Sequence, residues 1–159
     1  MAVQYYLAGC SLDGRTGHDA GRGLLEGLYQ AHAGGPMPPI RIAPGGKPYF
    51  ADSNWHFSIT HTQNHAFCVL ADRPVGLDAE EMDRPIRLEL AEKILSPGEM
   101  AQFQGAEDPR LALLTFWVLK EARGKRSGEG IVFHPRHTDF DLQDNQIQYR
   151  DGCILAIIF

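Results

Sequence analysis

The segment 109–131 constrains the fold of this chain most strongly. Pro109 suits the first turn of a helix, and Asp108 before it is a candidate N-cap. Apolar residues then recur at the spacing of one helical face, and these are Leu111, Leu114, Val118 and Ala122. Gly128 is one of several residues beyond them that are suited to ending a helix. The pattern predicts one long helix from about residue 110 that ends in a glycine-rich turn.

The edge of this predicted helix carries the first candidate chemistry. Trp117, Glu121 and Lys125 follow one another at four-residue steps and therefore lie along the edge of the apolar face. A Glu four residues before a Lys is a common intrahelical pair, worth only about 0.2–0.5 kcal/mol. Taken alone, the pair favours that structural interpretation. A functional role for the pair is supported only together with the acidic segment at residues 75–80.

Two further carboxylates lie in a predicted strand over residues 75–80. Asp78 and Glu80 are two residues apart, so their side chains share one face of the strand. Neighbouring carboxylates repel unless a cation lies between them, and Mg²⁺ prefers oxygen ligands that include substrate phosphates. A solvated strand end is the alternative, and it is favoured on this segment alone. Glu121, as a third carboxylate, strengthens the metal interpretation.

Composition and charge narrow the class of protein. Hydrophobic residues make up 43% of the chain, which is enough for a packed core. The formal net charge of −5 argues against a general nucleic-acid binder, and no apolar run is long enough for a membrane helix. The three cysteines are odd in number and widely spaced, which favours reduced thiols. We therefore expect a cytoplasmic protein whose partners are neither nucleic acids nor membranes.

The sequence pattern predicts both strands and helices on either side of a boundary near Gly76. Strands are expected at residues 2–8, 40–42, 57–60, 66–71, 75–80, 140–142, 147–149 and 153–159, and helices at 18–33, 88–95 and beyond 110. Ser96 and Glu99 have the spacing of a capping box, which predicts a further short helix that begins after Ser96. Asp144–Asn145 and Asp151–Gly152 are predicted hairpin turns. The expected class is α+β, with a boundary near Gly76 that divides residues 1–75 from residues 76–159.

Other polar residues carry weaker signals. His56, His61 and His65 match none of the usual zinc-ligand spacings, and the cysteines are remote in the sequence, so polar turns or a phosphate contact are favoured. Lys47 by itself is taken as an ordinary surface lysine, and Arg22 on the first predicted helix could equally belong to a solvated face. The sequence has no local signature of Ser–His–Asp or Cys–His catalysis.

Several segments, in order, resemble the motifs of the 4'-phosphopantetheinyl transferases. They cover roughly residues 19–131 and are Asp19–Leu25, Gly46–Pro48, Phe57–Thr62, Gly76–Glu80, Ser96–Glu99 and Trp117–Gly130. The Gly-Lys-Pro and His elements ahead of Gly76 indicate the double-length, surfactin-synthetase-activating type. That resemblance implies two similar α/β halves packed as a pseudodimer within one chain, and hence a monomer. The chain is short for this type, and Thr60 stands where Ser is more usual.

The resemblance also implies an activity and a set of site residues. The 4'-phosphopantetheine arm of coenzyme A would pass to a serine of an apo acyl or peptidyl carrier protein, with release of 3',5'-ADP. Mg²⁺, or Mn²⁺ in its place, would be held by Asp78, Glu80 and Glu121. Lys125 would stabilise diphosphate charge. Glu121 or a metal-bound water is also a candidate base, with Glu99 a weaker catalytic candidate. The nucleotide end would be held by Arg22, Lys47, Thr60, His61 and Lys125.

The same resemblance divides the roles between the halves. Residues 1–75 would form the nucleotide side, and residues 76–159 would carry the metal, the catalytic residues and the carrier-docking surface. An acidic carrier would need a local basic patch, for which the candidates are Arg84, Arg87, Lys93, Arg123 and Arg126. Two other interpretations stay open: a non-catalytic module that binds carrier protein or nucleotide, and a Mg²⁺-dependent diphosphate hydrolase.

Overall fold

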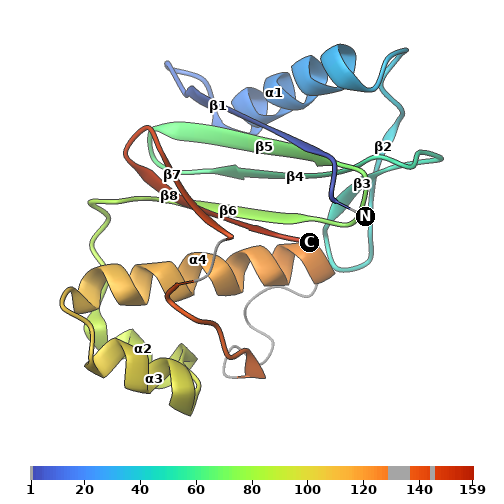
Figure 1. Ribbon diagram of the computed structural model, residues 1–159. Helices are drawn as coiled ribbons and strands as arrows, with labels where there is room; N and C mark the ends of the chain where they lie inside the picture. Colours follow the sequence, from blue (N-terminus) through green and yellow to red (C-terminus); the bar gives the residue numbers. More distant parts are fainter. Residues whose placement is uncertain (1, 129–136, 144–145) are drawn as a thin grey trace.

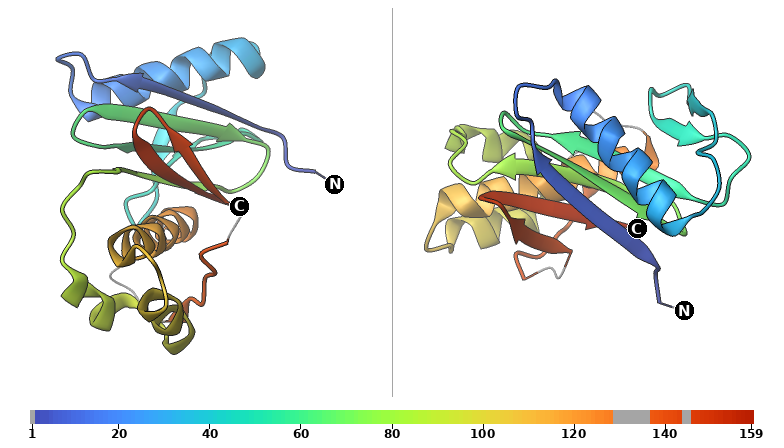
Figure 2. Two further views of the ribbon diagram at one scale, coloured as in Figure 1. Left: turned by 60° about the vertical axis from the view of Figure 1, so that its left-hand side comes forward. Right: turned by 90° about the horizontal axis from the view of Figure 1, so that it is seen from above.

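Two antiparallel sheets of three strands each lie at the centre of the structure (Figure 1). The computed structural model describes residues 2–128, 137–143 and 146–159. Helix α1 (Gly17–His32) covers the outer face of one sheet, and helix α4 (Pro109–Ser127) covers the outer face of the other (Figures 1 and 2). The smaller helices pack beyond α4. This arrangement confirms the predicted α+β class.

The first sheet is built from the N-terminal part of the chain. Its strands, in spatial order, are β1 (Tyr5–Ser11), β5 (His65–Ala71) and β4 (His56–His61). Helix α1 begins after Thr16, whose side chain accepts a hydrogen bond from the Asp19 backbone N–H, a standard N-cap contact. The helix packs its buried side chains, including Leu25, against the face of β5 that carries Cys68 and Leu70.

The second sheet comes from residues 76–81 and the C-terminal end of the chain. Its strands, in spatial order, are β6 (Gly76–Glu81), β8 (Cys153–Ile158) and β7 (Ile147–Arg150). The predicted caps of α4 are confirmed, because Asp108 accepts from the Leu111 N–H and Gly128 ends the helix at a positive φ of 82°. The predicted apolar face is also confirmed, since Val118 and its helical neighbours pack against β8.

The two sheets share a core between their inner faces. It contains Phe67 and Val69 from β5, Leu77 and Ala79 from β6, and Leu155 from β8. All six residues of β8 are buried, because one face of this strand meets the shared core and the other meets α4. A strand covered on both faces reads as a continuous apolar run, which is the pattern of the C-terminal sequence.

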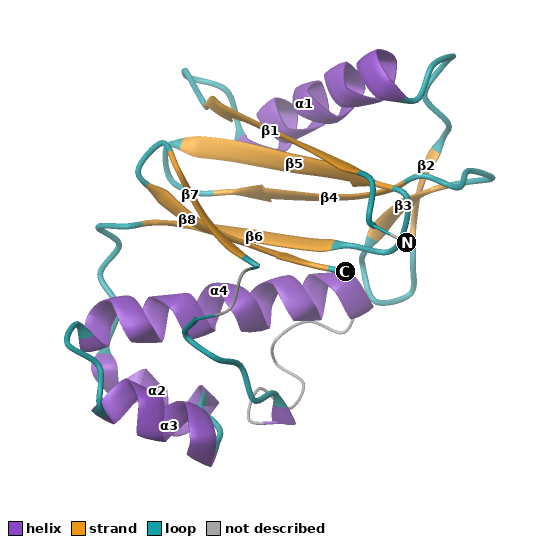
Figure 3. Ribbon diagram, viewed as in Figure 1, coloured by secondary structure: helices purple, strands orange, loops and turns teal. Residues whose placement is uncertain are grey.

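Shorter elements complete the described chain (Figure 3). They are β2 (Ile40–Ile42), β3 (Pro48–Phe50), η1 (Leu88–Leu90), α2 (Ala91–Ile94) and α3 (Pro97–Gln104). Strand β3 was not predicted; it pairs with β2 across the loop that contains Lys47. The predicted helix at residues 88–95 is divided between η1 and α2.

The predicted strand at residues 140–142 is wrong. These residues have no strand structure, because their backbone N–H groups bond to side chains of α3. Phe140 N donates to Glu99 Oε2 at 2.8 Å, and Leu142 N donates to Gln102 Oε1 at 2.9 Å. The predicted turn at Asp151–Gly152 is confirmed, with positive φ at both residues. The predicted turn at Asp144–Asn145 lies outside the described residues.

Gly76 permits a close approach of α4 to β6. A Cβ at this position would overlap the Ala122 carbonyl oxygen and the Arg126 backbone N. We therefore expect Gly76→Ala to lower the free energy of unfolding by about 1–3 kcal/mol, the usual cost of overpacking. Gly23→Ala is the matched control, because Gly23 lies in α1 with nothing within 4 Å of the added methyl. The control should gain about 0.5–1 kcal/mol, and urea unfolding of both variants measures the difference.

Candidate functional site

Three of the predicted site residues meet where β4, β6 and α4 come together. Thr60 lies on β4, Asp78 on β6 and Lys125 in the last turn of α4. Lys125 Nζ donates to Asp78 Oδ1 at 2.9 Å and to Thr60 Oγ1 at 3.0 Å. Thr60 Oγ1 in turn donates to Asp78 Oδ1 at 3.3 Å. Side chains that lie far apart in the sequence thus form one hydrogen-bonded group.

Asp78 is the most enclosed carboxylate of this group. It is 6% exposed, and its Oδ2 has no hydrogen-bond partner among the described residues. Burial raises the pKa of Asp78, and the charge of Lys125 offsets only part of that rise. A buried carboxylate oxygen without a partner is costly unless a cation or a donor reaches it. Asp78 therefore presents an oxygen suited to a positively charged ligand.

Glu80 and Glu121 add two half-buried carboxylates beside Asp78. For each of them, burial is the main cause that raises the pKa, and the negative charge of Asp78 is the second. Glu80 Oε1 accepts from Arg84 Nη1 at 2.6 Å and from Trp117 Nε1 at 3.2 Å. Within the described part of the chain, Glu121 makes neither a hydrogen bond nor an ion pair. We call Asp78, Glu80 and Glu121 the acidic group.

Trp117 has a role that sequence reasoning did not assign. Its indole N–H donates to Glu80, and the Arg84 guanidinium lies over its ring, 5.7 Å from the centroid. The available signal was its four-residue spacing from Glu121, which places both on the same edge of α4. Trp117 and Arg84 together hold the Glu80 carboxylate in place.

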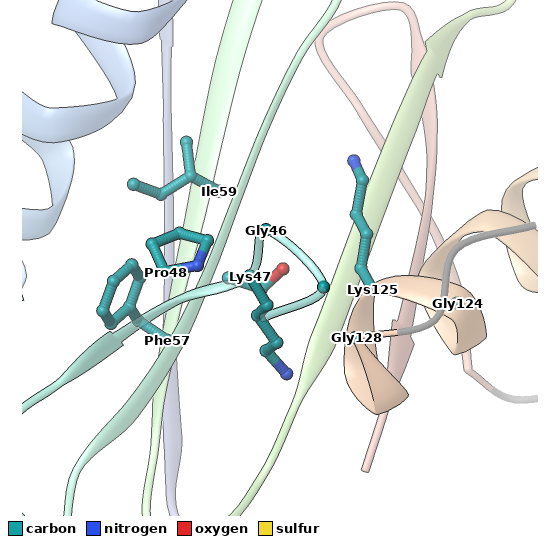
Figure 4. Close-up of a pocket in the computed structure, with 10 residues that line it drawn as sticks. Gly46, Lys47, Pro48, Phe57, Ile59, Gly124, Lys125 and Gly128 are labelled. Carbon is teal, nitrogen blue, oxygen red and sulfur yellow. The ribbon is translucent and has the colours of Figure 1, made fainter. Parts of the chain in front are cut away.

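A cavity of about 280 Å³ adjoins the Lys125 end of this group (Figure 4). Its walls come from three places: the loop at residues 45–48, the start of β4 and the C-terminal end of α4. Phe57, Ile59 and Pro48 make part of it apolar, while the glycines of the loop and of α4 expose backbone. The cavity combines an apolar surface with a nearby ammonium group.

Lys47 lines this cavity but directs its amine elsewhere. In Figure 4 the Lys47 and Lys125 side chains point in opposite directions. Lys47 Nζ donates to the Arg126 carbonyl at 2.8 Å and to the Val75 carbonyl at 3.2 Å. Burial is the main cause that lowers the pKa of Lys47. Its contacts therefore join the loop to the end of α4 and to the residue before β6.

The structure does not bring His61 or Arg22 into contact with the acidic group. His61 follows Thr60 on β4 and so points to the opposite face of the strand. Its ring lies under Gly17 at the start of α1, where an added Cβ would overlap it. Arg22 is a half-buried residue of α1. Both residues lie on the α1 side of the first sheet.

Glu99 lies at the N-terminus of α3, apart from the acidic group. It is fully buried and forms a capping box with Ser96, as the sequence predicts. Its Oε1 also accepts from Lys120 Nζ at 2.6 Å in an ion pair that is closed to solvent. Lys120 is next to Glu121 in α4 but faces α3, whereas Glu121 lies on the edge nearest β6. The contacts of Glu99 are therefore those of a helix cap and of a buried ion pair.

The chain is similar to known phosphopantetheinyl transferases. The sequence model of the 4'-phosphopantetheinyl transferase superfamily matches residues 74–155. A 4'-phosphopantetheinyl transferase of Bacillus subtilis is 30% identical over 113 residues, which are 67% of this chain and 50% of the relative. The 4'-phosphopantetheinyl transferase HetI of Nostoc sp. is 31% identical over 123 residues, 71% of this chain and 52% of the relative.

A third relative has the same name over a shorter match. The 4'-phosphopantetheinyl transferase psf-1 of Bacillus pumilus is 34% identical over 91 residues, 55% of this chain and 39% of the relative. The chain spans about half the length of the curated relatives that it matches. Among the described residues, no helix is both long and apolar enough to cross a membrane. The family match extends over more than half of the sequence, and the chain belongs to the 4'-phosphopantetheinyl transferase superfamily.

Proposed function

We propose that this chain transfers the 4'-phosphopantetheine arm of coenzyme A to a serine of an apo acyl or peptidyl carrier protein. The serine hydroxyl oxygen would bond to the β-phosphorus, the bond from that phosphorus to the bridging oxygen would break, and 3',5'-ADP would leave. The observation that carries this proposal is the buried Asp78 oxygen without a partner, beside the Lys125 amine and two more carboxylates. The names of the curated relatives support it.

The acidic group fits a bound Mg²⁺, with Mn²⁺ as an alternative ion. Asp78, Glu80 and Glu121 supply oxygen ligands of the kind that Mg²⁺ prefers. Burial is the first cause that raises the pKa of all three residues, and the negative charge of Asp78 adds to it for Glu80 and Glu121, so a cation between them would offset both effects. When bound, the ion would neutralise charge that develops on the diphosphate.

The side chains around the acidic group have separable roles in this proposal. Lys125 would hold a diphosphate oxygen by its ammonium group, and its bond to Thr60 would orient it. Glu121 makes no hydrogen bond or ion pair among the described residues and would accept the proton of the serine hydroxyl. Arg84 and Trp117 would keep Glu80 ionised and in position. Glu99 stays a weaker candidate, because its described contacts are the α3 cap, the Lys120 ion pair and the Phe140 N–H, all apart from the acidic group.

The nucleotide end of coenzyme A would lie on the side formed by residues 1–75. The cavity beside Lys125 has apolar walls from Phe57 and Ile59, which suit the flat face of a base. Thr60 borders the acidic group, and Lys47 would shape the glycine loop through its two carbonyl contacts. Arg22 and His61 would supply contacts from the α1 side.

A duplicated architecture with its site between the halves accords with the topology. In each sheet the spatial order is first, last and middle strand in sequence: β1-β5-β4 and β6-β8-β7. In the sequence, the long helix α1 lies between β1 and β4 of the first sheet, and the long helix α4 lies between β6 and β7 of the second. We propose residues 1–75 and 76–159 as the two halves of a pseudodimer. Thr60 and Asp78 then meet across the halves within a single copy, which favours a monomer.

A groove next to the acidic group offers a docking surface for an acidic carrier. Its lining holds three cationic side chains, one acidic side chain and several apolar ones; these include Arg84, Ile86, Arg87, Glu89, Leu90 and Lys93. Arg84 also contacts Glu80, so the groove adjoins the acidic group directly. Because the chain has a net charge of −5, attraction of an acidic partner needs such a local patch. We propose this part of residues 76–159 as the carrier-docking surface.

An assay with coenzyme A and an apo carrier protein tests the function. We expect Mg²⁺-dependent gain of the phosphopantetheine mass by the carrier, and Asp78→Asn should lower the rate by at least about 10²-fold, as for other charge-stabilising groups. Asp83→Asn is the matched control, because Asp83 is an exposed acid just beyond β6. Release of 3',5'-ADP without carrier modification would indicate a diphosphate hydrolase. Binding without either reaction would indicate a non-catalytic module.

The charge of Asp78 should make the metal-free protein less stable as the pH rises. Its pKa is raised in the folded state, so folding favours the protonated form, and that stability is lost as pH rises from about 4 through the raised pKa. Without Mg²⁺ at pH 7, Asp78→Asn should therefore melt at the same or a higher temperature than wild type, and the two should converge at low pH. A marked drop in the variant's melting temperature at pH 7 would contradict this interpretation.

Substitution of Arg22 and of Lys47 should both weaken coenzyme A binding, but only substitution of Lys47 should also lower the free energy of unfolding. Arg22→Ala should raise the Michaelis constant for coenzyme A more than it lowers turnover, with stability changed by less than about 0.5 kcal/mol. Lys47→Ala should also destabilise the fold by about 1–3 kcal/mol, because two carbonyls lose a charged donor. Arg41→Ala, an exposed site on β2, is the control. Wild-type coenzyme kinetics in both variants would contradict a nucleotide site on this side.

A further inference from the structure

The core between the two sheets ends in a polar cluster. Along β5, β6 and β8, the residues that face this core alternate with residues that face the helices, and they are apolar over most of each strand. At one edge of the core, the next residues on the same faces are His65, Glu81 and Cys153. Glu81 and Cys153 are directly paired across the second sheet, and His65 reaches them from the first. Three side chains of different metal-binding types therefore meet at strand positions where the pattern of the core predicts apolar residues.

We propose that His65, Glu81 and Cys153 form a binding site for a zinc-like divalent cation, separate from the acidic group. Cys153 Sγ lies 3.6 Å from His65 Nδ1 and 3.4 Å from Glu81 Oε2. A tetrahedral zinc ion with usual bond lengths holds nitrogen, oxygen and sulfur ligands about 3.4–3.6 Å apart. The three groups each offer a ligand atom, and these atoms all lie within 4.8 Å of one another. His65 Nδ1 and Glu81 Oε1, which are hydrogen-bonded at 3.0 Å, would separate slightly to admit the ion.

The donor set selects the kind of ion. Imidazole and thiolate ligands suit Zn²⁺ and related transition metals, whereas Mg²⁺ prefers oxygen ligands alone. Three protein ligands leave a fourth position for water. The Cys153 side chain is fully buried, while those of His65 and Glu81 are 20% and 15% exposed, so an ion would enter past the latter two.

Neighbouring groups already orient the carboxylate. Thr62 Oγ1 donates to Glu81 Oε1 at 2.6 Å, and the Asn64 backbone N–H donates to the same oxygen at 3.2 Å. Hydrogen bonds of this kind fix ligands in metal sites and contribute to affinity. The turn between β4 and β5, which carries both donors, thus positions Glu81 from the opposite sheet.

The site is distinct from the acidic group although Glu80 and Glu81 are adjacent in sequence. Successive residues of a strand point to opposite faces. Asp78 and Glu80 contact Lys125 and Trp117 of α4, whereas Glu81 contacts His65 of the first sheet. An ion held by His65, Glu81 and Cys153 would join β5 to β6 and β8. It would therefore stabilise the association of the two sheets by mass action.

Cobalt spectroscopy and zinc calorimetry test the proposal on the full chain after treatment with a chelator, with excess Mg²⁺ present to occupy the acidic group. We expect one equivalent of Zn²⁺ to bind, and Co²⁺ to give a thiolate-to-metal charge-transfer band. Cys153→Ala should abolish that band and weaken Zn²⁺ binding by at least about 10–100-fold, the loss caused by removing even an outer partner. Cys68→Ala is the matched control, because Cys68 is equally buried but faces α1.

Two further variants keep the test decisive. His65→Gln should also lose the tight site, which covers the case in which Cys153→Ala fails to fold. Asp78→Asn should retain both the Co²⁺ band and the Zn²⁺-dependent rise in melting temperature. Absence of Zn²⁺ binding to wild type would overturn the proposal and leave a hydrogen-bonded edge of the core. A charge-transfer band that survives Cys153→Ala would overturn it as well.

Discussion

The packing of α4 against β6 is the contact on which the rest of the structure depends. Gly76 lets the helix backbone approach the strand closely, and α4 then covers the outer face of β8. The same approach brings Lys125 to Asp78 and Trp117 to Glu80. Hydrophobic burial along most of the helix therefore fixes the relative positions of charged groups along one edge of it. A rigid support of this kind is what a site with defined geometry requires.

Two buried carboxylates, Glu99 and Asp78, show how compensation differs between a structural position and a candidate functional one. The Lys120–Glu99 pair is closed to solvent, but Glu99 also receives backbone donors from Ser96 and Phe140. Asp78 is nearly as buried, yet its Oδ2 has no partner among the described residues. A buried ion pair whose oxygens already have hydrogen-bond donors is consistent with a structural role, because no carboxylate oxygen is left for a ligand to bind. An unsatisfied carboxylate oxygen beside two more acids is consistent with a place for a cation.

Strand β6 places different chemistry on its two faces. One face carries Asp78 and Glu80 toward α4, in the group that we propose for Mg²⁺. The other carries Leu77 and Ala79 into the core and ends at Glu81, beside His65 and Cys153. Successive side chains of a strand point to opposite faces, so the adjacent residues Glu80 and Glu81 belong to two separate groups. Oxygen ligands lie on one side and a mixed set of nitrogen, sulfur and oxygen on the other.

The sequence alone determined the features that depend on neighbouring residues. The caps and apolar face of α4, the capping box of α3 and the turn at Asp151–Gly152 were predicted because helix and turn signals act over a few residues. Ordered motifs also pointed to the family and to the acidic residues. Strand alternation placed Asp78 and Glu80 on one face before any contact was known.

Only the tertiary structure decided which distant groups meet. Residues 140–142 did not form the predicted strand, because side chains of α3 bond to their backbone. Lys47 gained its partners from Val75 and Arg126, and His61 was placed under Gly17, away from Thr60. His65 and Cys153 are 88 residues apart and meet only because two sheets pack face to face. Local patterns specify the elements, but which side chains end up adjacent is decided by how the hydrophobic faces of those elements pack together.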